Sequence, residues 1–477
     1  MASRAEAAPP SFKWAAGAAI ACALGFALLS QAFPLEQHYL AGAVLVTVVG
    51  LVALAVVAWY VDPAYLLIAA LVLSAFNNHW DAFGLPRLVT PDRFLLIAAL
   101  GAVLLRCPAA ADRSTVPLRG VHALLALFLA WAVGSAIAAG TLAESDALFG
   151  IVDRFAVPFA LFLLAPIIFR TPRQRRALLG VLVAFGAYLG LTAVFETLGP
   201  RALVYPSFIL DPSYGYHGGR ARGPFIEANA NGVGLYVSLV AAAIAVATWR
   251  RPEARLAAWA VGLLCAAGLL LTLTRSVWVA SVIASFVSLA AFRETRRLAI
   301  PAMAGGAALS VALLAVFPQL QERAVERKDA QRSVSERRNV NAAALAMVGE
   351  RPLLGFGWST FRERNAEYFP LLEDVPQTAE RRLAIHNVLL TFATELGLIG
   401  ATLFALGFLL AVGRAVATRG PPDLLAWRIG LLAIALFWVV VAMFAPLGQV
   451  LPTFIPWLWA GIVLGPVLLA ERRQGGA

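Results

Sequence analysis

Three stretches of the sequence contain residue types that could do chemistry, and the first combines glycines with arginines. It runs Gly218-Gly219-Arg220-Ala221-Arg222-Gly223-Pro224-Phe225 and leads into Glu227-Ala228-Asn229-Ala230-Asn231. Glycine lets a backbone approach a ligand closely, and arginine holds phosphate oxygens with a planar fork. The stretch therefore predicts a phosphate site with Arg220 and Arg222 as candidate ligands. The alternative is an ordinary turn before an apolar span, with its arginines among lipid headgroups.

The second stretch places a cation between two apolar runs. Its sequence is Leu271-Thr272-Leu273-Thr274-Arg275-Ser276-Val277-Trp278. A charged side chain at such a junction is costly unless it is paired or binds an anion. Arg275 is therefore a second candidate anion ligand. The alternative is a snorkelling arginine, whose long side chain carries its charge to the membrane interface.

The third stretch begins with His386-Asn387, directly before an apolar run that contains Glu395. A neutral imidazole can take a proton from an attacking hydroxyl near neutral pH, so His386 is a candidate general base. The alternative is a polar residue that merely starts a helix. Glu395 falls on a different helical face from His386, and we interpret it as a partner for an arginine rather than for the histidine.

The composition shows which class of protein must position these residues. The chain of 477 residues is 61% hydrophobic and only 14% charged, with a mean hydropathy of +0.79. Soluble domains are usually about a quarter charged, so a soluble fold is excluded. The net charge of +11 comes from arginines between apolar runs, where membrane proteins carry them, so no nucleic-acid partner is expected. The three cysteines and five histidines show no metal-ligand spacing, and we expect neither a metal nor a cofactor.

Fourteen apolar segments alternate with polar connections along the chain. A helix that spans a bilayer needs roughly 20 predominantly apolar residues, and most of the segments approach that length. They run near residues 12–33, 39–60, 64–76, 94–106, 121–139, 155–169, 177–198, 228–249, 256–273, 277–292, 298–317, 387–413, 424–445 and 453–470. The sequence therefore predicts an all-α polytopic membrane protein with about 12–14 transmembrane helices.

The placement of arginine predicts the orientation of these spans. Short arginine-rich connections such as 170–176 and 250–255 belong on the cytoplasmic side, because basic residues gather there. Residues 199–227 and 318–385 then form two long segments on the opposite side. We expect the chain in the bacterial cytoplasmic (inner) membrane, surrounded by membrane lipids, with its three chemical stretches facing the periplasm.

The longer polar segment, 318–385, is expected to contain short helices. Residues 335–348 carry apolar side chains at helical spacing, and Ser335 is a candidate N-cap. This pattern favours an amphipathic helix at or near the membrane surface, ended before Pro352.

In order along the chain, these stretches resemble the O-antigen ligase and polymerase superfamily of bacterial envelope glycosyltransferases. The resemblance also includes a proline-leucine-glycine segment, Pro352-Leu353-Leu354-Gly355-Phe356-Gly357-Trp358. It divides the chain into N-terminal transmembrane helices (1–199), a catalytic region (200–412) that includes the periplasmic loop 318–385, and C-terminal helices with a cytoplasmic tail (413–477). It implies a fold like that of the C-type membrane glycosyltransferases.

The resemblance also implies roles for individual residues. His386 would be the base that activates the acceptor hydroxyl, and Asn387 beside it would bind substrate. Arg275 and Arg220, with Arg222 in support, would bind the pyrophosphate of a polyprenyl-linked glycan donor. The family's asparagine usually follows a proline; Ala228 stands there instead, which leaves the roles of Asn229 and Asn231 open.

The implied reaction is an inverting, metal-independent glycan transfer from that donor to an acceptor sugar. A ligase would use lipid A-core as the acceptor, and a polymerase would extend a growing glycan on its carrier. A third variant transfers glycans to protein. From a different class, a polysaccharide transporter or flippase also fits a chain of many spans. However, the two similar halves and broken midplane helices of many transporters are not evident in the sequence.

Overall fold

The computed structural model describes residues 56–84, 90–106, 120–214, 219–317, 327–368, 384–418 and 420–475. Every regular element in these ranges is a helix, which confirms the all-α prediction. The predicted span at 12–33 and most of the one at 39–60 lie outside the described residues. Each of the twelve later apolar segments coincides with a helix.

Eight helical stretches in the described part are long and apolar enough to cross a membrane, so the chain is a multi-pass membrane protein. They are Gly120–Ala139, Ser145–Ile168, Pro172–Thr197, Ala228–Thr248, Pro252–Leu271, Arg296–Val316, Val388–Ala417 and Pro422–Ala442. Two shorter apolar helices, Arg275–Ala291 and Val450–Gly465, accompany them. A helix satisfies all its backbone hydrogen bonds internally, which is why apolar runs in lipid adopt this form.

The chain forms two compact units. The first contains the described residues up to 106 together with Thr171–Val181. In it α3 (Pro63–Leu73) packs against α4 (Pro91–Arg106), and η1 (Ser74–Phe83) follows α3 directly. The buried carboxylate of Asp92 accepts hydrogen bonds from Asn77 Nδ2 (2.6 Å) and Trp80 Nε1 (2.8 Å), which ties η1 to the start of α4.

The second unit, Val116–Arg170 and Leu182–Ala477, holds all the candidate site residues. Its helices are α5 (Gly120–Ala139), α6 (Ser145–Ile151), η2 (Val152–Ala156), α7 (Val157–Ile168), the later part of α8 (Pro172–Thr197), η3 (Arg201–Leu203), η4 (Ser207–Leu210), η5 (Gly223–Phe225), α9 (Ala228–Thr248), α10 (Pro252–Leu271), α11 (Arg275–Ala291), η6 (Arg296–Leu298), α12 (Ala299–Val316), α14 (Arg327–Glu350), α15 (Phe361–Arg364), η7 (Asn365–Tyr368), α16 (Val388–Ala417), η8 (Pro422–Leu424), α17 (Leu425–Ala442) and α18 (Val450–Gly475).

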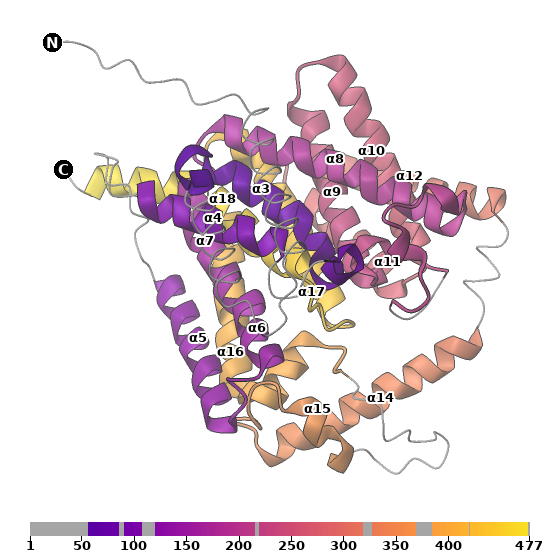
Figure 1. Cartoon of the computed structure of the whole chain (residues 1–477). Helices are drawn as coiled ribbons and strands as arrows, with labels where there is room; N and C mark the ends of the chain where they lie inside the picture. The colour runs from indigo at the N-terminus through magenta and orange to yellow at the C-terminus, as the bar shows by residue number, and fades with distance from the viewer. Residues whose placement is uncertain are drawn as a thin grey trace, which may run out of the picture. The chain divides into compact units, whose positions relative to one another are not determined.

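Helices far apart in the sequence pair closely in this unit. α7 packs on α18 and α11 on α17, and α5 runs beside α16 (Figure 1). Aromatic rings fill the space between α5, α7 and α16, with Phe128 and Phe155 4.8 Å apart and Phe392 and Phe404 also 4.8 Å apart in edge-on contacts. Such pairs stabilise packing beyond the area that they bury.

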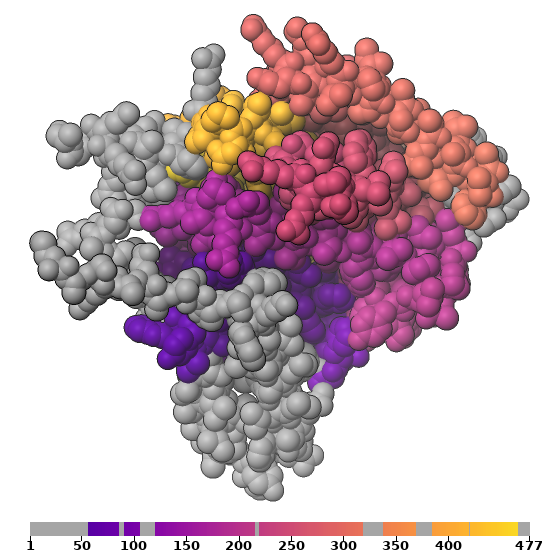
Figure 2. Space-filling view, turned by 90° about the horizontal axis from the view of Figure 1, so that it is seen from above, coloured from indigo at the N-terminus to yellow at the C-terminus, as the bar shows by residue number. Residues whose placement is uncertain are grey.

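The outer surface of α10 and α12 is apolar. These helices lie side by side in Figure 2, in rose and salmon. Leu256, Trp259, Ile300 and Val311 are each more than half exposed there. In a multi-pass membrane protein such a surface contacts lipid, so these side chains need no protein partner.

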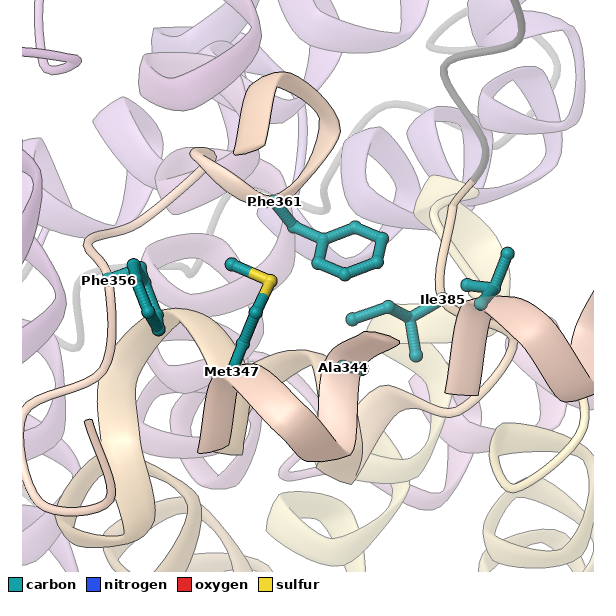
Figure 3. Packing of buried hydrophobic residues seen from close by; sticks show 6 residues of the cluster. Ala344, Met347, Phe356, Phe361 and Ile385 are labelled. Atoms are coloured by element: carbon teal, nitrogen blue, oxygen red, sulfur yellow. The ribbon is translucent and has the colours of Figure 1, made fainter. Parts of the chain in front are cut away.

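The described part of the long polar segment folds against α16. Val340, Ala344 and Met347 of α14 form a buried cluster with Phe361 and Ile385 (Figure 3). The spacing of the three α14 residues defines one helical face, which confirms the amphipathic helix. The predicted N-cap is wrong, because α14 continues back to Arg327, well before Ser335. The helix extends further toward the N-terminus than its apolar residues indicate.

α16 is broken at Gly397, whose φ of 71° and ψ of 177° lie outside the helical region. The glycine segment (residues 352–358) docks against this break. Phe356 N donates to Thr394 O (3.0 Å), Gly357 N to Glu395 O (2.9 Å), and Leu398 N to Pro352 O (2.7 Å). Carbonyls that would otherwise be unpaired at a helix end thus find partners in the segment. A Cβ at position 397 would overlap Leu353 O, so the close approach requires glycine.

Candidate functional site

The arginine turn (residues 219–227) is fixed by hydrogen bonds to two neighbouring helices. Glu196 at the end of α8 accepts from the backbone N–H groups of Arg222 and Gly223, each at 3.0 Å. Ala221 N donates to Leu271 O (3.0 Å), and Asn231 Nδ2 donates to Ala221 O (3.0 Å). The turn therefore has one defined conformation rather than that of a loose connection.

Arg222 is built into this turn and its guanidinium is already engaged. Nη1 donates to Tyr214 O and Nη2 to Ile209 O, both at 2.8 Å, while Nε lies 3.5 Å from a carboxylate oxygen of Glu196. The residue is only 4% exposed. These contacts hold the preceding 201–214 segment onto the turn. Arg222, predicted as a substrate ligand, is placed where it serves the structure of the turn.

Arg220 is half-buried on the same turn and faces a second arginine that the sequence did not single out. Arg337, on the half-buried side of α14, lies in electrostatic contact with Arg220. Burial and the positive charge of Arg220 both lower the pKa of Arg337. Its buried Nε has no hydrogen-bond partner among the described residues. Two guanidiniums within electrostatic range of each other are an arrangement that an anion with several oxygens neutralises.

Arg275 lies at the same end of the bundle. It is the first residue of α11 and is exposed. The residues around it are linked to the first stretch twice. Ala221 N of the arginine turn donates to Leu271 O at the end of α10, and Ser276 Oγ of α11 donates to Asn229 Oδ1 of α9 (3.1 Å). Asn229, whose role the sequence left open, thus links the two arginine-bearing stretches. The structure brings the first and second chemical stretches together, as predicted.

His386 directly precedes α16 and is half-buried. Its neighbour Ile385 packs in the cluster with Val340 and Ala344 of α14. Val340 lies one helical turn after Arg337, so α14 connects the histidine to the arginine pair. Through this helix the third stretch joins the other two.

Asn387 is the N-cap of α16. Its Oδ1 accepts a hydrogen bond from Leu390 N (3.0 Å), which satisfies one of the free N–H groups of the first turn. This contact does not test the predicted substrate-binding role of Asn387. It does account for an asparagine at this position without any ligand. The cap fixes the start of the helix and with it the backbone at His386.

Glu395 is buried on the first half of α16 (residues 388–396). One carboxylate oxygen accepts from Phe361 N at 3.3 Å, at the start of α15. Arg154 and Arg362 are its electrostatic partners. These two charges favour the interpretation that Glu395 pairs with an arginine, which stays a prediction.

Sequence reasoning missed Arg337 because α14 offers several arginines and no pattern that separates them. Arg337 and Arg338 are adjacent, yet Arg338 is exposed and Arg337 half-buried. The useful signal was the apolar face: Arg337 lies three residues before Val340 and seven before Ala344, on the face that packs inward. Arg338 falls outside that face.

Comparison with known proteins identifies one family over part of the chain. None of the curated proteins matches the chain. The family model described as O-Antigen ligase matches residues 260–405. The match begins in α10 and ends in α16, so Arg275, Arg337 and His386 fall inside it, while Arg220 precedes it. The chain thus carries an O-antigen ligase domain over residues 260–405, of the kind shared by the ligases and polymerases that link polysaccharides.

Proposed function

We propose that the chain is an inverting glycosyltransferase that moves a glycan from a polyprenyl pyrophosphate carrier to an acceptor sugar hydroxyl. The observation that carries the proposal is that Arg337 of α14 interacts electrostatically with Arg220, while Val340 of the same helix packs with Ile385, the residue before His386. A site that concentrates positive charge beside an imidazole suits a reaction with an anionic leaving group and a neutral nucleophile. The O-antigen ligase domain supports the same chemistry.

Each residue has a defined part in the proposed step. His386 accepts the proton of the acceptor hydroxyl as its oxygen forms a bond to the anomeric carbon. The bond from that carbon to the pyrophosphate oxygen breaks, and its electron pair leaves with the pyrophosphate. Arg220, Arg337 and Arg275 stabilise the negative charge that develops there. Attack opposite the leaving group inverts the configuration of the anomeric carbon.

The long polar segment supports the step by excluding water. α14 and α15 pack through the Val340–Met347 face onto the start of α16, beside His386. A covered site protects an activated donor from hydrolysis, which would compete with transfer. We place this face of the protein in the periplasm, in the inner membrane of a bacterium.

The favoured acceptor is lipid A-core, which makes the protein an O-antigen ligase. Polymerisation, with a growing glycan as acceptor, uses the same donor chemistry and remains the main alternative. Transport without transfer is the second alternative. The three differ in their product, so a single assay with purified protein separates them.

The test uses the full chain in lipid nanodiscs with a polyprenyl pyrophosphate-linked glycan and purified lipid A-core. We expect a glycan–lipid A product and free polyprenyl pyrophosphate in equal amounts. Elongated carrier-linked glycan instead would assign the polymerase reaction. Movement of intact donor across a vesicle membrane, with no new glycosidic bond, would contradict the proposal.

The base has its own test within this assay. His386→Ala is expected to lower transfer by roughly 10²–10⁴-fold, as loss of a general base does, while donor binding persists. His217, in the other long polar segment and outside the described residues, provides the comparison. Loss of transfer in His217→Ala but not in His386→Ala would move the base to that segment.

Orientation is tested separately by cysteine labelling of whole cells. A cysteine at position 374, in the long polar segment, should react with an impermeant reagent. A cysteine at position 173, at the start of α8, should not. The reverse pattern would place the proposed site on the cytoplasmic side.

A further inference from the structure

Arg154 lies in the interior of the helical bundle, on a backbone feature that the mechanism above does not use. It belongs to η2 (Val152–Ala156), a π-helical turn inside the apolar stretch Ser145–Ile168. π-helical turns are rare and concentrate at functional sites. A charged side chain inside a spanning helix is costly unless it has partners, and its partners indicate its role.

One partner leads to the arginine turn. The Arg154 guanidinium contacts the 443–449 connection, because a Cβ at Gly448 would lie 3.0 Å from Nη2. Gln449, the next residue, hydrogen-bonds the side chain of Glu227, which is also within electrostatic reach of Arg154. Glu227 is the N-cap residue of α9 and ends the arginine turn. Burial raises the pKa of Glu227, and the Gln449 hydrogen bond and the charge of Arg154 oppose this.

The other partner leads to the histidine. Glu395, which has the strongest electrostatic interaction with Arg154 among the acidic residues, lies on the first half of α16, which begins directly after His386 and Asn387. The same carboxylate accepts from Phe361 N and so also holds α15. Because the break at Gly397 separates this half-helix from the rest of α16, its orientation depends on such side-chain contacts.

We propose that Arg154 is a positioning residue that holds the arginine turn and the His386 half-helix in a fixed relation through Glu227 and Glu395. The proposal rests on the proposed function, since it assigns Arg154 to the same site. A cation that interacts with both the half-buried carboxylate of Glu227 and the buried carboxylate of Glu395 makes the position of each depend on the other. Removing the cation takes away a charge partner of both carboxylates, Glu227 on one side and Glu395 on the other.

The rival explanation is that Arg154 only stabilises the fold. Coupling between the effects of substituting Glu227 and Glu395 on kcat/KM distinguishes the positioning role from this rival. Glu227→Gln, Glu395→Gln and the double variant are made in the native background and again with Arg154→Met. Residues in one network show non-additive effects, whereas independent residues do not. Arg428→Met is the matched control. Arg428 donates Nε and Nη2 to Val416 O at 3.1 and 2.7 Å, in α16 but away from both carboxylates.

With Arg154 present, we expect the two glutamine substitutions to be coupled in kcat/KM by roughly threefold or more. With Arg154→Met the coupling should disappear, and Arg154→Lys should keep part of it, since lysine retains the charge without the fork. Arg428→Met should leave the coupling intact. Additive effects on kcat/KM in the native background would overturn the proposal.

The same set of variants is measured by thermal unfolding, which needs no substrate. Coupling in unfolding temperature without coupling in kcat/KM would reduce Arg154 to a structural role and also overturn the proposal. If the native protein transfers no glycan, the proposed function fails on its own. Binding of polyprenyl pyrophosphate then replaces kcat/KM as the readout. Additive effects of Glu227→Gln and Glu395→Gln on that binding would overturn the positioning role of Arg154.

Discussion

The guanidiniums of Arg220 and Arg337 lie in electrostatic contact, although one belongs to a turn before α9 and the other to α14. Two like charges that approach each other in a half-buried setting repel, and each also loses hydration. The arrangement is therefore costly in the empty protein and favourable once an anion lies between them. This reversal gives the site a signature that can be measured without any glycan.

Arg337→Ala is expected to reverse the effect of pyrophosphate on stability. Without ligand the variant should unfold at the same temperature as the native protein or higher, because a repulsive buried charge is gone. Inorganic pyrophosphate should stabilise the native protein and stabilise the variant much less, with an affinity lower by roughly 10–100-fold, as loss of a charged hydrogen bond implies. Thermal unfolding over a pyrophosphate titration measures both.

Arg338→Ala is the control for this experiment, because it removes the same charge from the next, exposed position of α14. It should leave the pyrophosphate titration close to that of the native protein. Equal loss of affinity in the two variants would mean that α14 attracts anions by its overall charge and that Arg337 has no special place.

Arg222 and Arg220 are expected to differ although they are two residues apart. Arg222→Ala leaves the buried carboxylate of Glu196 without its cation and two backbone carbonyls without donors. Breaking a buried pair in this way costs about 3–5 kcal/mol in the free energy of unfolding. Arg220→Ala should instead lower donor affinity and leave stability nearly unchanged. Urea unfolding and donor binding of both variants check this, and a stable Arg222→Ala with weakened donor binding would restore Arg222 as a ligand.

Arg275→Ala is expected to lower transfer by roughly 10²-fold, the effect of removing one group that stabilises a developing anion. Arg275→Lys should recover only part of the rate, because an ammonium cannot form the planar two-point contact. Arg296→Ala, which removes an exposed arginine near the other end of α11, is the control. Full activity of Arg275→Ala at equal expression would exclude Arg275 from the site.

Much of the fold could be predicted because lipid imposes a simple rule on the sequence. An apolar run long enough to span must be helical, and each described segment obeyed this. The convergence of Arg220, Arg275 and His386 on one unit also followed from their placement at the ends of spans. The sequence could not show which polar side chains form hydrogen bonds within the fold and so are not available to a ligand. Arg222 and Arg220 are both arginines of the same turn, yet the Nη1 and Nη2 donors of Arg222 are hydrogen-bonded to backbone carbonyls of the preceding 201–214 segment.

Arg337 and the break in α16 escaped prediction for a related reason. The choice between Arg337 and Arg338 depends on helix phase, and α14 begins eight residues before the predicted Ser335. Gly397 looks like any glycine of an apolar helix until residues 352–358 are placed against it. Both features arise from contacts between segments distant in sequence, which local patterns do not encode.

Gly397→Ala tests whether that break positions the half-helix that follows His386. Alanine is strained at a φ of 71° with a ψ of 177°, at a cost of about 1–3 kcal/mol, and its Cβ would also overlap Leu353 O. The glycine segment must then separate from α16, which removes the partners of Thr394 O and Glu395 O. We expect a lower unfolding temperature, faster proteolysis near the exposed Leu353 and Leu354, and a reduced kcat because His386 is no longer held.

Gly413→Ala on the same helix is the matched control, because its added Cβ would meet nothing within 4 Å. There alanine favours the helix, and stability should rise by roughly 0.5–1 kcal/mol with kcat unchanged. The comparison separates the helix break from a general effect of replacing glycine in α16. If both variants keep native proteolysis and native kcat, the glycine segment does not hold the half-helix, and the position of His386 must be set by α14 alone.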